Sequence, residues 1–262
     1  MPVVVDWPTD GVCRLRLNNP ERLNALSGAM IAALRAGIES AERKAAGILV
    51  LAGAGRAFCA GADLKERRAL DDAGKLAHNR SIAATADALA EAPMPTLAVL
   101  NGLALGGGCE LALACDMRIA AGSASIGLTE ARIGAIPGAG GTQRLPRLIG
   151  TGRAFQMMYG GEPVDAETAL DWGLVNAVFE DDRLEGEALR FSSRVASRSR
   201  QASSLLKRTV RQGMDRTLAE GLELERQAVM QVLASEDYAE GLAAFAMKRP
   251  PTFNKVGNKV GQ

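Results

Sequence analysis

The order of apolar and polar positions predicts several strands in the first 180 residues. From Val12 to Leu17 apolar residues alternate with arginines, which is typical of a half-buried strand, and Asp10-Gly11 predicts a hairpin turn before it. The continuous apolar run at residues 48–51 predicts a strand that is buried on both faces. Further strands are predicted at residues 3–7, 96–100, 117–120, 124–127 and 174–179.

Other segments have the spacing of amphipathic helices. Ser27 is placed to cap a helix that runs to about Lys44, with Met30 and Leu34 on its apolar face. Residues 64–91 predict a long and mostly helical region, which two prolines end. An interruption is expected near residues 71–74, and shorter helices are predicted at 109–115, 142–149, 153–159 and 165–172.

The character of the chain changes after Asp182, because only helical patterns follow. These helices are predicted at residues 184–197, 202–214, 218–233 and 236–247, ahead of a basic tail rich in glycine and proline. The sequence therefore predicts an α/β body of repeated strand-strand-helix units over residues 1–190 and a helical module over residues 191–262. Because isolated amphipathic helices are marginal in water, the module is expected to pack on the body or on another subunit.

The composition is that of a globular protein. The 262 residues are 47% hydrophobic and 23% charged, and the net charge of +1 requires neither nucleic acid nor an anionic membrane as a partner. No apolar stretch reaches the roughly 18 residues of a membrane span, and the first residues lack the pattern of a signal peptide. The four cysteines contain no C-x-x-C pair, so neither disulfides nor a zinc site is expected, and a cytoplasmic location is predicted.

Three consecutive glycines, Gly106 to Gly108, stand between the predicted strand at 96–100 and a helical segment. The first turn of a helix carries unpaired N–H groups and the positive end of the helix dipole, and glycine lets a ligand approach that backbone closely. A second turn of small residues, Ala60 to Ala62, also follows a strand and precedes a helix. Each turn alone is consistent with a simple tight connection, whereas the two together can form an oxyanion hole with converging N–H donors.

Carboxylates are the best candidates for proton transfer. The only histidine, His78, lies in a polar stretch and is expected to be solvated, so histidine-dependent catalysis is disfavoured. Glu110 lies in an apolar segment beside the glycines, where burial would raise its pKa, and a second carboxylate such as Glu130 would raise one of the two further. The alternative is that a glutamate in a first helical turn only complements the dipole.

Two other features carry weaker signals. The loop at residues 134–145 is rich in glycine but matches neither the dinucleotide-binding nor the phosphate-loop pattern. The segment at 190–211 is rich in basic residues and is a candidate nucleic-acid surface, but few aromatic residues accompany them. A solvated or phosphate-facing role is favoured for these basic side chains.

Three motifs in order resemble the enoyl-CoA hydratase (crotonase) superfamily. They are Phe58-Cys59-Ala60-Gly61-Ala62-Asp63-Leu64, the segment from Asn101 to Glu110, and Ile136-Pro137-Gly138-Ala139-Gly140-Gly141-Thr142-Gln143-Arg144-Leu145. The resemblance covers almost the whole chain and implies a spiral of ββα units followed by a C-terminal helical module. It is less specific for the reaction, because members of this superfamily also isomerise, cleave, dehalogenate and decarboxylate acyl-CoA thioesters.

The resemblance also implies roles for particular residues. The oxyanion donors fall on the amides of Ala62 and Gly107, and the two hydratase glutamates fall on Glu110 and Glu130. Contacts to the adenine and pantetheine of the substrate fall on or near Arg22, Ala25, Ala60, Asp63, Leu64 and Lys65. Residues 61–67 and 102–108 resemble the methylglutaconyl-CoA hydratase branch in particular, some members of which bind RNA.

The sequence thus predicts a hydratase that adds water across the 2,3 double bond of a 2-enoyl-CoA thioester. Coenzyme A enters as part of the substrate, and neither a metal nor a redox cofactor is expected. A homotrimer or homohexamer assembled through the helical module is expected, with no membrane or nucleic-acid partner. The alternatives are an enoyl-CoA isomerase on the same fold and an RNA-binding protein with residual hydratase activity.

Overall fold

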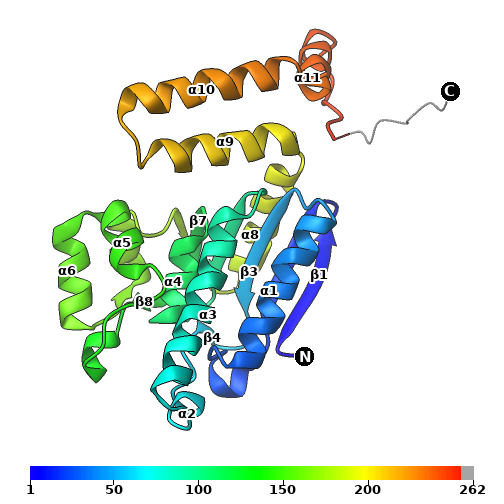
Figure 1. The fold of residues 1–262 in the computed structure, drawn as a ribbon. Coiled ribbons are helices and arrows are strands. Elements are labelled where there is room, and N and C mark those ends of the chain that lie inside the picture. Colours follow the sequence, from blue (N-terminus) through cyan, green and yellow to red (C-terminus); the bar gives the residue numbers. More distant parts are fainter. Residues whose placement is uncertain (255–262) are drawn as a thin grey trace.

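The computed structural model describes residues 1–254 and contains two β-sheets with helices around them (Figure 1). The larger sheet has six strands in the order β1-β2-β3-β5-β7-β10. These strands are β1 (Val3–Thr9), β2 (Val12–Leu17), β3 (Ile48–Gly53), β5 (Thr96–Leu100), β7 (Met117–Ala121) and β10 (Ala177–Phe179). β1 and β2 form the predicted antiparallel hairpin, and all other neighbours in this sheet are parallel.

The smaller sheet has four strands in the order β4-β6-β8-β9. They are β4 (Ala57–Cys59), β6 (Leu103–Leu105), β8 (Ser125–Gly127) and β9 (Val164–Asp165). The pairs β3-β4, β5-β6 and β7-β8 each place one strand in each sheet, so that successive units advance as a spiral, which confirms the predicted repetition. The prediction omitted β4, β6 and β9 because strands of two or three residues are too short to show an alternating pattern.

Helices and two short 3-10 turns connect the strands. In the body they are η1 (Pro20–Arg22), α1 (Gly28–Arg43), α2 (Leu64–Arg67), α3 (Asp72–Glu91), α4 (Gly107–Ala114), η2 (Glu130–Ile133), α5 (Gly141–Ile149), α6 (Thr151–Gly160), α7 (Ala166–Asp171) and α8 (Leu184–Ala196). Ser27 caps α1 as predicted, since its hydroxyl accepts a hydrogen bond from Met30 N at 3.2 Å. Asp71 caps α3 in the same way and accounts for the expected interruption.

The larger sheet is covered on both faces. Leu49 and Leu51 of β3 point into the main core with α1, α3 and α4, whereas Ile48 and Val50 point to the opposite face. There they pack in a second apolar cluster with Leu184 and other residues of α8. This arrangement confirms the prediction that residues 48–51 form a strand buried on both sides.

The last three helices are α9 (Arg200–Gly213), α10 (Leu218–Leu233) and α11 (Glu236–Ala246), and they extend away from the sheets (Figure 1). α9 is attached to the body by ion pairs from Lys207 and Arg211 to Asp116, at 2.9 and 2.7 Å. The expected division between residues 190 and 191 lies within α8, and the last part of the expected tail, residues 255–262, lies outside the described residues. No helix within residues 1–254 has the length and apolarity needed to cross a membrane.

Candidate active site

Two of the three glycines at the start of α4 are required by their surroundings, and the third lies near the other turn. Gly106 has a φ of +51°, and a β-carbon there would lie 3.0 Å from Oε1 of Glu130. A β-carbon on Gly108 would lie 2.2 Å from the carbonyl oxygen of Cys59. A β-carbon on Gly107 would lie 3.7 Å from the backbone nitrogen of Ala62. The helix begins at Gly107, two residues earlier than predicted. Gly106 and Gly108 are needed because other groups approach them closely, and Gly107 and Gly108 do not prevent the helix from forming.

The structure brings together the two turns that the sequence singled out. Gly61 has a φ of +93°, and a β-carbon on it would lie 2.8 Å from Leu105 O and 3.2 Å from Gly107 N. Within residues 1–254, neither the N–H of Ala62 nor that of Gly107 donates a hydrogen bond to another group. The second N–H also stands at the positive end of α4. Two N–H groups without a partner therefore lie on adjoining turns.

A buried asparagine that sequence reasoning missed supports this arrangement. The Asn24 amide donates hydrogen bonds to the carbonyl oxygens of Ala54 and Ala57, at 2.9 and 2.8 Å. Leu26 then continues the same segment and forms a bridge to Ala62, in which Leu26 N donates to Gly61 O at 2.8 Å. In the sequence Asn24 belongs to a polar loop, and nothing in its neighbours indicates that the side chain turns inward.

The residues expected to contact coenzyme A lie around the same turn. Asp63 is buried and caps α2, accepting hydrogen bonds from Lys65 N and Glu66 N at 3.0 and 3.1 Å. Its carboxylate also pairs with Arg22 at 2.9 Å. Ala60 N donates to Leu23 O at 3.0 Å, which joins the loop before α1 to the end of β4. Ala25 and Ala60 are half-buried here, whereas Leu64 and the side chain of Lys65 are exposed.

Glu110 projects from the first turn of α4 and is only 3% exposed. Its Oε1 accepts hydrogen bonds from Ala139 N at 2.6 Å and Gly141 N at 2.9 Å. Burial raises the pKa of Glu110, while these backbone donors and the charge of Arg144 oppose the increase. The glycine-rich loop at 134–145 therefore has a clear structural role, which is to hold this carboxylate.

Glu130 lies in η2, close to the glycine turn. Burial raises its pKa from 4.5 to about 7, and the negative charge of Glu110 contributes in the same direction. Its Oε2 atom is buried and has no hydrogen-bond partner among the described residues. A carboxylate whose pKa is near neutrality can both accept and deliver a proton, as the sequence led us to expect for one member of this pair.

Arg67 and His78 form a second polar contact beside these carboxylates. The Arg67 charge lowers the pKa of Glu130, and its guanidinium NH2 lies 3.4 Å from Nδ1 of His78. His78 Nε2 lies 2.8 Å from the carbonyl oxygen of Leu26. Because a carbonyl can only accept, Nε2 carries the hydrogen and Nδ1 is free to accept from Arg67.

The expectation that His78 is solvated was wrong, since the residue is only 7% exposed. Its position on α3 explains the difference. His78 lies four residues before Ile82 and eleven before Leu89, both of which are buried, so helical periodicity places it on the inward face. That spacing was the available signal, and the polar neighbours in sequence concealed it.

The geometry places two N–H groups without an acceptor among the described residues beside the carboxylates of Glu110 and Glu130. The family model described as enoyl-CoA hydratase/isomerase matches residues 8–256, and the chain belongs to this family. A probable enoyl-CoA hydratase of Rhizobium meliloti is 42% identical over 241 residues, covering 91% of this chain and 93% of the relative. The mitochondrial methylglutaconyl-CoA hydratase of Mus musculus is 37% identical over 250 residues, covering 93% and 79%.

Solved structures agree with this assignment. A crystal structure of enoyl-CoA hydratase from Bacillus anthracis matches with a TM-score of 0.95 and 42% identity, covering 97% of this chain and 99% of that one. The predicted fold class is confirmed: the chain has the crotonase fold, a mixed α/β spiral with C-terminal helices.

The raised pKa of Glu130 makes stability depend on pH. The unfolded chain releases the Glu130 proton near pH 4.5, but the folded chain releases it only near pH 7. The bound proton therefore stabilises the folded chain fully below pH 4.5, and this contribution to the free energy of unfolding is lost as the pH rises through 7. Glu130→Gln has no proton to lose and should gain about 1–2 kcal/mol relative to wild type between about pH 5 and pH 8. Chemical denaturation at a series of pH values measures this difference, with the exposed Glu91→Gln as a control. A difference that stays constant with pH would contradict the assignment.

Arg67 provides a second test of the electrostatics. Replacement by Met removes the positive charge that lowers the pKa of Glu130, so the titration midpoint of Glu130 should rise. Carboxyl ¹³C NMR measures this midpoint directly, with Glu130→Gln to identify the signal. Arg68→Met removes an exposed charge from the adjacent position and should leave the midpoint in place. Equal midpoints in wild type and Arg67→Met would show that Arg67 does not act on Glu130.

Proposed function

We propose that the protein hydrates 2-enoyl-CoA thioesters to 3-hydroxyacyl-CoA esters. The observation that carries this proposal is that two carboxylates with raised pKa values, Glu110 buried and Glu130 half-buried, lie beside two unpaired backbone donors. A site with only one carboxylate could move a proton between carbons, as in an isomerase. Two carboxylates can also hold and activate a water molecule, which favours hydration.

In the proposed reaction, the thioester oxygen accepts hydrogen bonds from the N–H groups of Ala62 and Gly107. The oxygen of a water molecule bonds to the β-carbon, and the electron pair of the double bond moves onto the thioester oxygen. The two donors stabilise the resulting enolate, and loss of one donor of this kind typically costs ~3–4 kcal/mol. Glu110 and Glu130 together take one proton from the water and deliver a proton to the α-carbon, so the net change is addition of H and OH.

Coenzyme A is proposed as the handle that positions the acyl group. Support comes from the gathering of Arg22, Ala25, Ala60 and Lys65 around the Ala62 turn. Binding energy from a remote part of the substrate can position the reacting carbons precisely. Both proton transfers and charge stabilisation are assigned to residues of the chain, so the proposed reaction requires no metal or redox cofactor.

Methylglutaconyl-CoA is the particular substrate that we propose to test first. The motif at residues 61–67 and the similarity to a methylglutaconyl-CoA hydratase support this choice. Crotonyl-CoA serves as the unbranched comparison.

We further propose that the protein assembles as a trimer or a dimer of trimers in the cytoplasm. Large apolar side chains on the last three helices support the assembly, since Leu206, Met230 and Phe245 are 67%, 70% and 86% exposed. The four cysteines are free thiols, which suits a reducing compartment. Lys207 and Arg211 are engaged with Asp116, which reduces the basic surface that a nucleic acid could contact.

Substitution of each glutamate tests the reaction. Glu110→Gln and Glu130→Gln should each lower kcat for hydration by about 10²–10⁴-fold, because the amide cannot exchange the proton. Loss of the enoyl absorbance measures the rate, and Glu91→Gln should keep the wild-type rate. Circular dichroism confirms that each variant is folded.

Wild-type rates in both active-site variants would refute the site. An enzyme that binds acyl-CoA esters but hydrates none, and instead converts a 3-enoyl-CoA to the 2-enoyl isomer, would be an isomerase. RNA binding that falls with salt and survives both substitutions would support the third alternative.

A further inference from the structure

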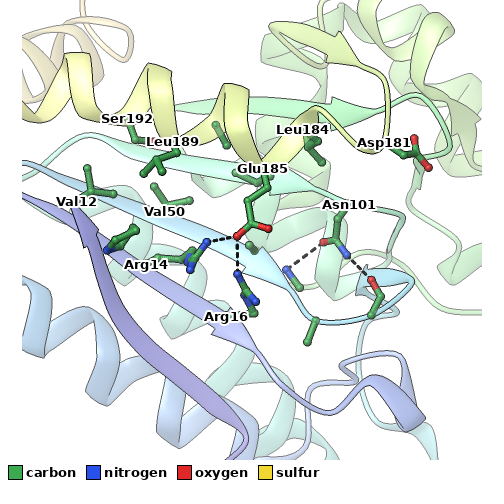
Figure 2. A pocket seen from close by; sticks show the side chains of 17 residues that line it. Val12, Arg14, Arg16, Val50, Asn101, Asp181, Leu184, Glu185, Leu189 and Ser192 are labelled. Carbon is green, nitrogen blue, oxygen red and sulfur yellow. Dashed lines mark hydrogen bonds and ion pairs between the residues drawn. The ribbon is translucent and has the colours of Figure 1, made fainter.

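A cavity of about 310 Å³ lies between α8 and the larger sheet, away from the glycine turns. Figure 2 shows that side chains of β2, β3 and α8 surround it. The helices α1, α3 and α4, which frame the proposed active site, pack on the opposite face of this sheet. The proposed hydration reaction uses none of the residues that line this cavity, so an occupant would be separate from the acyl-CoA substrate.

The cavity has an apolar floor and a charged mouth. Val12, Val50 and Val99 form the floor, and Leu184 and Leu189 of α8 cover it. Two arginines of β2 stand at the mouth, and both bind the same oxygen of the same carboxylate (Figure 2). Oε1 of Glu185 lies 2.5 Å from NH1 of Arg14 and 2.9 Å from NH2 of Arg16.

A buried hydroxyl without a partner lies in the same cavity. Ser192 is fully buried, and its Oγ forms no hydrogen bond with any of the described residues. Leaving a buried polar atom unsatisfied is costly, but an aliphatic chain cannot supply the missing hydrogen bond, so this hydroxyl does not determine the class of ligand.

We propose that this cavity binds a small amphipathic monocarboxylate, whose carboxylate takes the place of Glu185 on Arg14 and Arg16 while its aliphatic chain lies on the valine floor. The volume is within the range of small-molecule sites, at its lower end.

Glu185 is suited to be displaced. Its side chain is 71% exposed, and exposed ion pairs contribute little to stability, so the exchange of one carboxylate for another costs little. Arg14 stays oriented without it, because the Asp6 carboxylate accepts from its Nε and NH2 at 3.0 and 2.6 Å. With Glu185 turned outward, two guanidinium groups face the single carboxylate of Asp6, and this excess positive charge favours an anion.

The opposite end of the cavity disfavours a reversed ligand. Asp181 lies there, and Ser123 N donates a hydrogen bond to its Oδ1 at 3.1 Å. The hydrogen bonds from Ser123 lower the pKa of Asp181, so this end is negatively charged. A carboxylate at the Asp181 end would meet like charge, so the arginine end sets the orientation.

Isothermal titration calorimetry with octanoate tests the proposal on the full chain. Octanoate should bind with a dissociation constant below about 1 mM, and octan-1-ol, which has the same chain without the charge, should bind at least about tenfold more weakly. Glu185→Gln removes the internal competitor and should tighten octanoate binding at least about threefold. Arg16→Gln removes one donor and should weaken it at least about fivefold.

Matched controls lie on the same helix. Glu187→Gln removes the same charge as Glu185→Gln, and Arg190→Gln removes the same charge as Arg16→Gln. Glu187 and Arg190 pair with each other on α8 at 3.3 Å, and neither lines the cavity. They should leave octanoate affinity unchanged. The proposal is overturned if octanoate does not bind, if octan-1-ol binds equally well, or if the affinity is indifferent to both Glu185→Gln and Arg16→Gln. The last result would place octanoate elsewhere, including the acyl site.

Discussion

The close approach of two bare turns is the constraint on which the rest of the site depends. Gly61 and Gly107 come so near that a side chain on Gly61 would collide with Leu105 O, and Gly108 lies directly against Cys59 O. No side chain separates these backbones, which is what the proposed oxyanion hole formed by the N–H groups of Ala62 and Gly107 requires. The spiral of ββα units makes this contact possible, since β4 and β6 are neighbours in the smaller sheet and each leads into one of the turns.

The second requirement is electrostatic. Two carboxylates lie close enough for the charge of Glu110 to raise the pKa of Glu130, which by itself disfavours ionisation of both. The fold offsets this cost unequally. Glu110 receives two backbone hydrogen bonds from the glycine-rich loop, whereas Glu130 has the Arg67 charge nearby and an unsatisfied oxygen. This difference separates the protonation behaviour of two chemically identical groups, which suits a reaction that must both remove and deliver a proton.

The features that the sequence predicts well are local ones. The hairpin, the Ser27 cap, the strand at 48–51 and the small-residue turns each have a signal within a few residues, and their association with Glu110 and Glu130 follows from known motifs. The features that the sequence predicts poorly depend on contacts between distant segments. Asn24 is buried because its side chain donates a hydrogen bond to Ala57 O of β4. His78 is buried because α3 turns it toward Leu26, which lies 52 residues earlier. The short strands β4 and β6 likewise depend on pairing with distant segments, β4 with β6 and β6 also with β8.

The central claim is that Ala62 and Gly107 polarise the thioester oxygen. The most direct measurement is the infrared carbonyl stretch of crotonyl-CoA bound to the Glu110→Gln/Glu130→Gln double variant, which keeps both N–H donors but cannot complete the reaction. This stretch should move to lower frequency than in free crotonyl-CoA, because two hydrogen bonds draw electron density onto the oxygen. A bound thioester whose stretch stays at the free value would contradict the account.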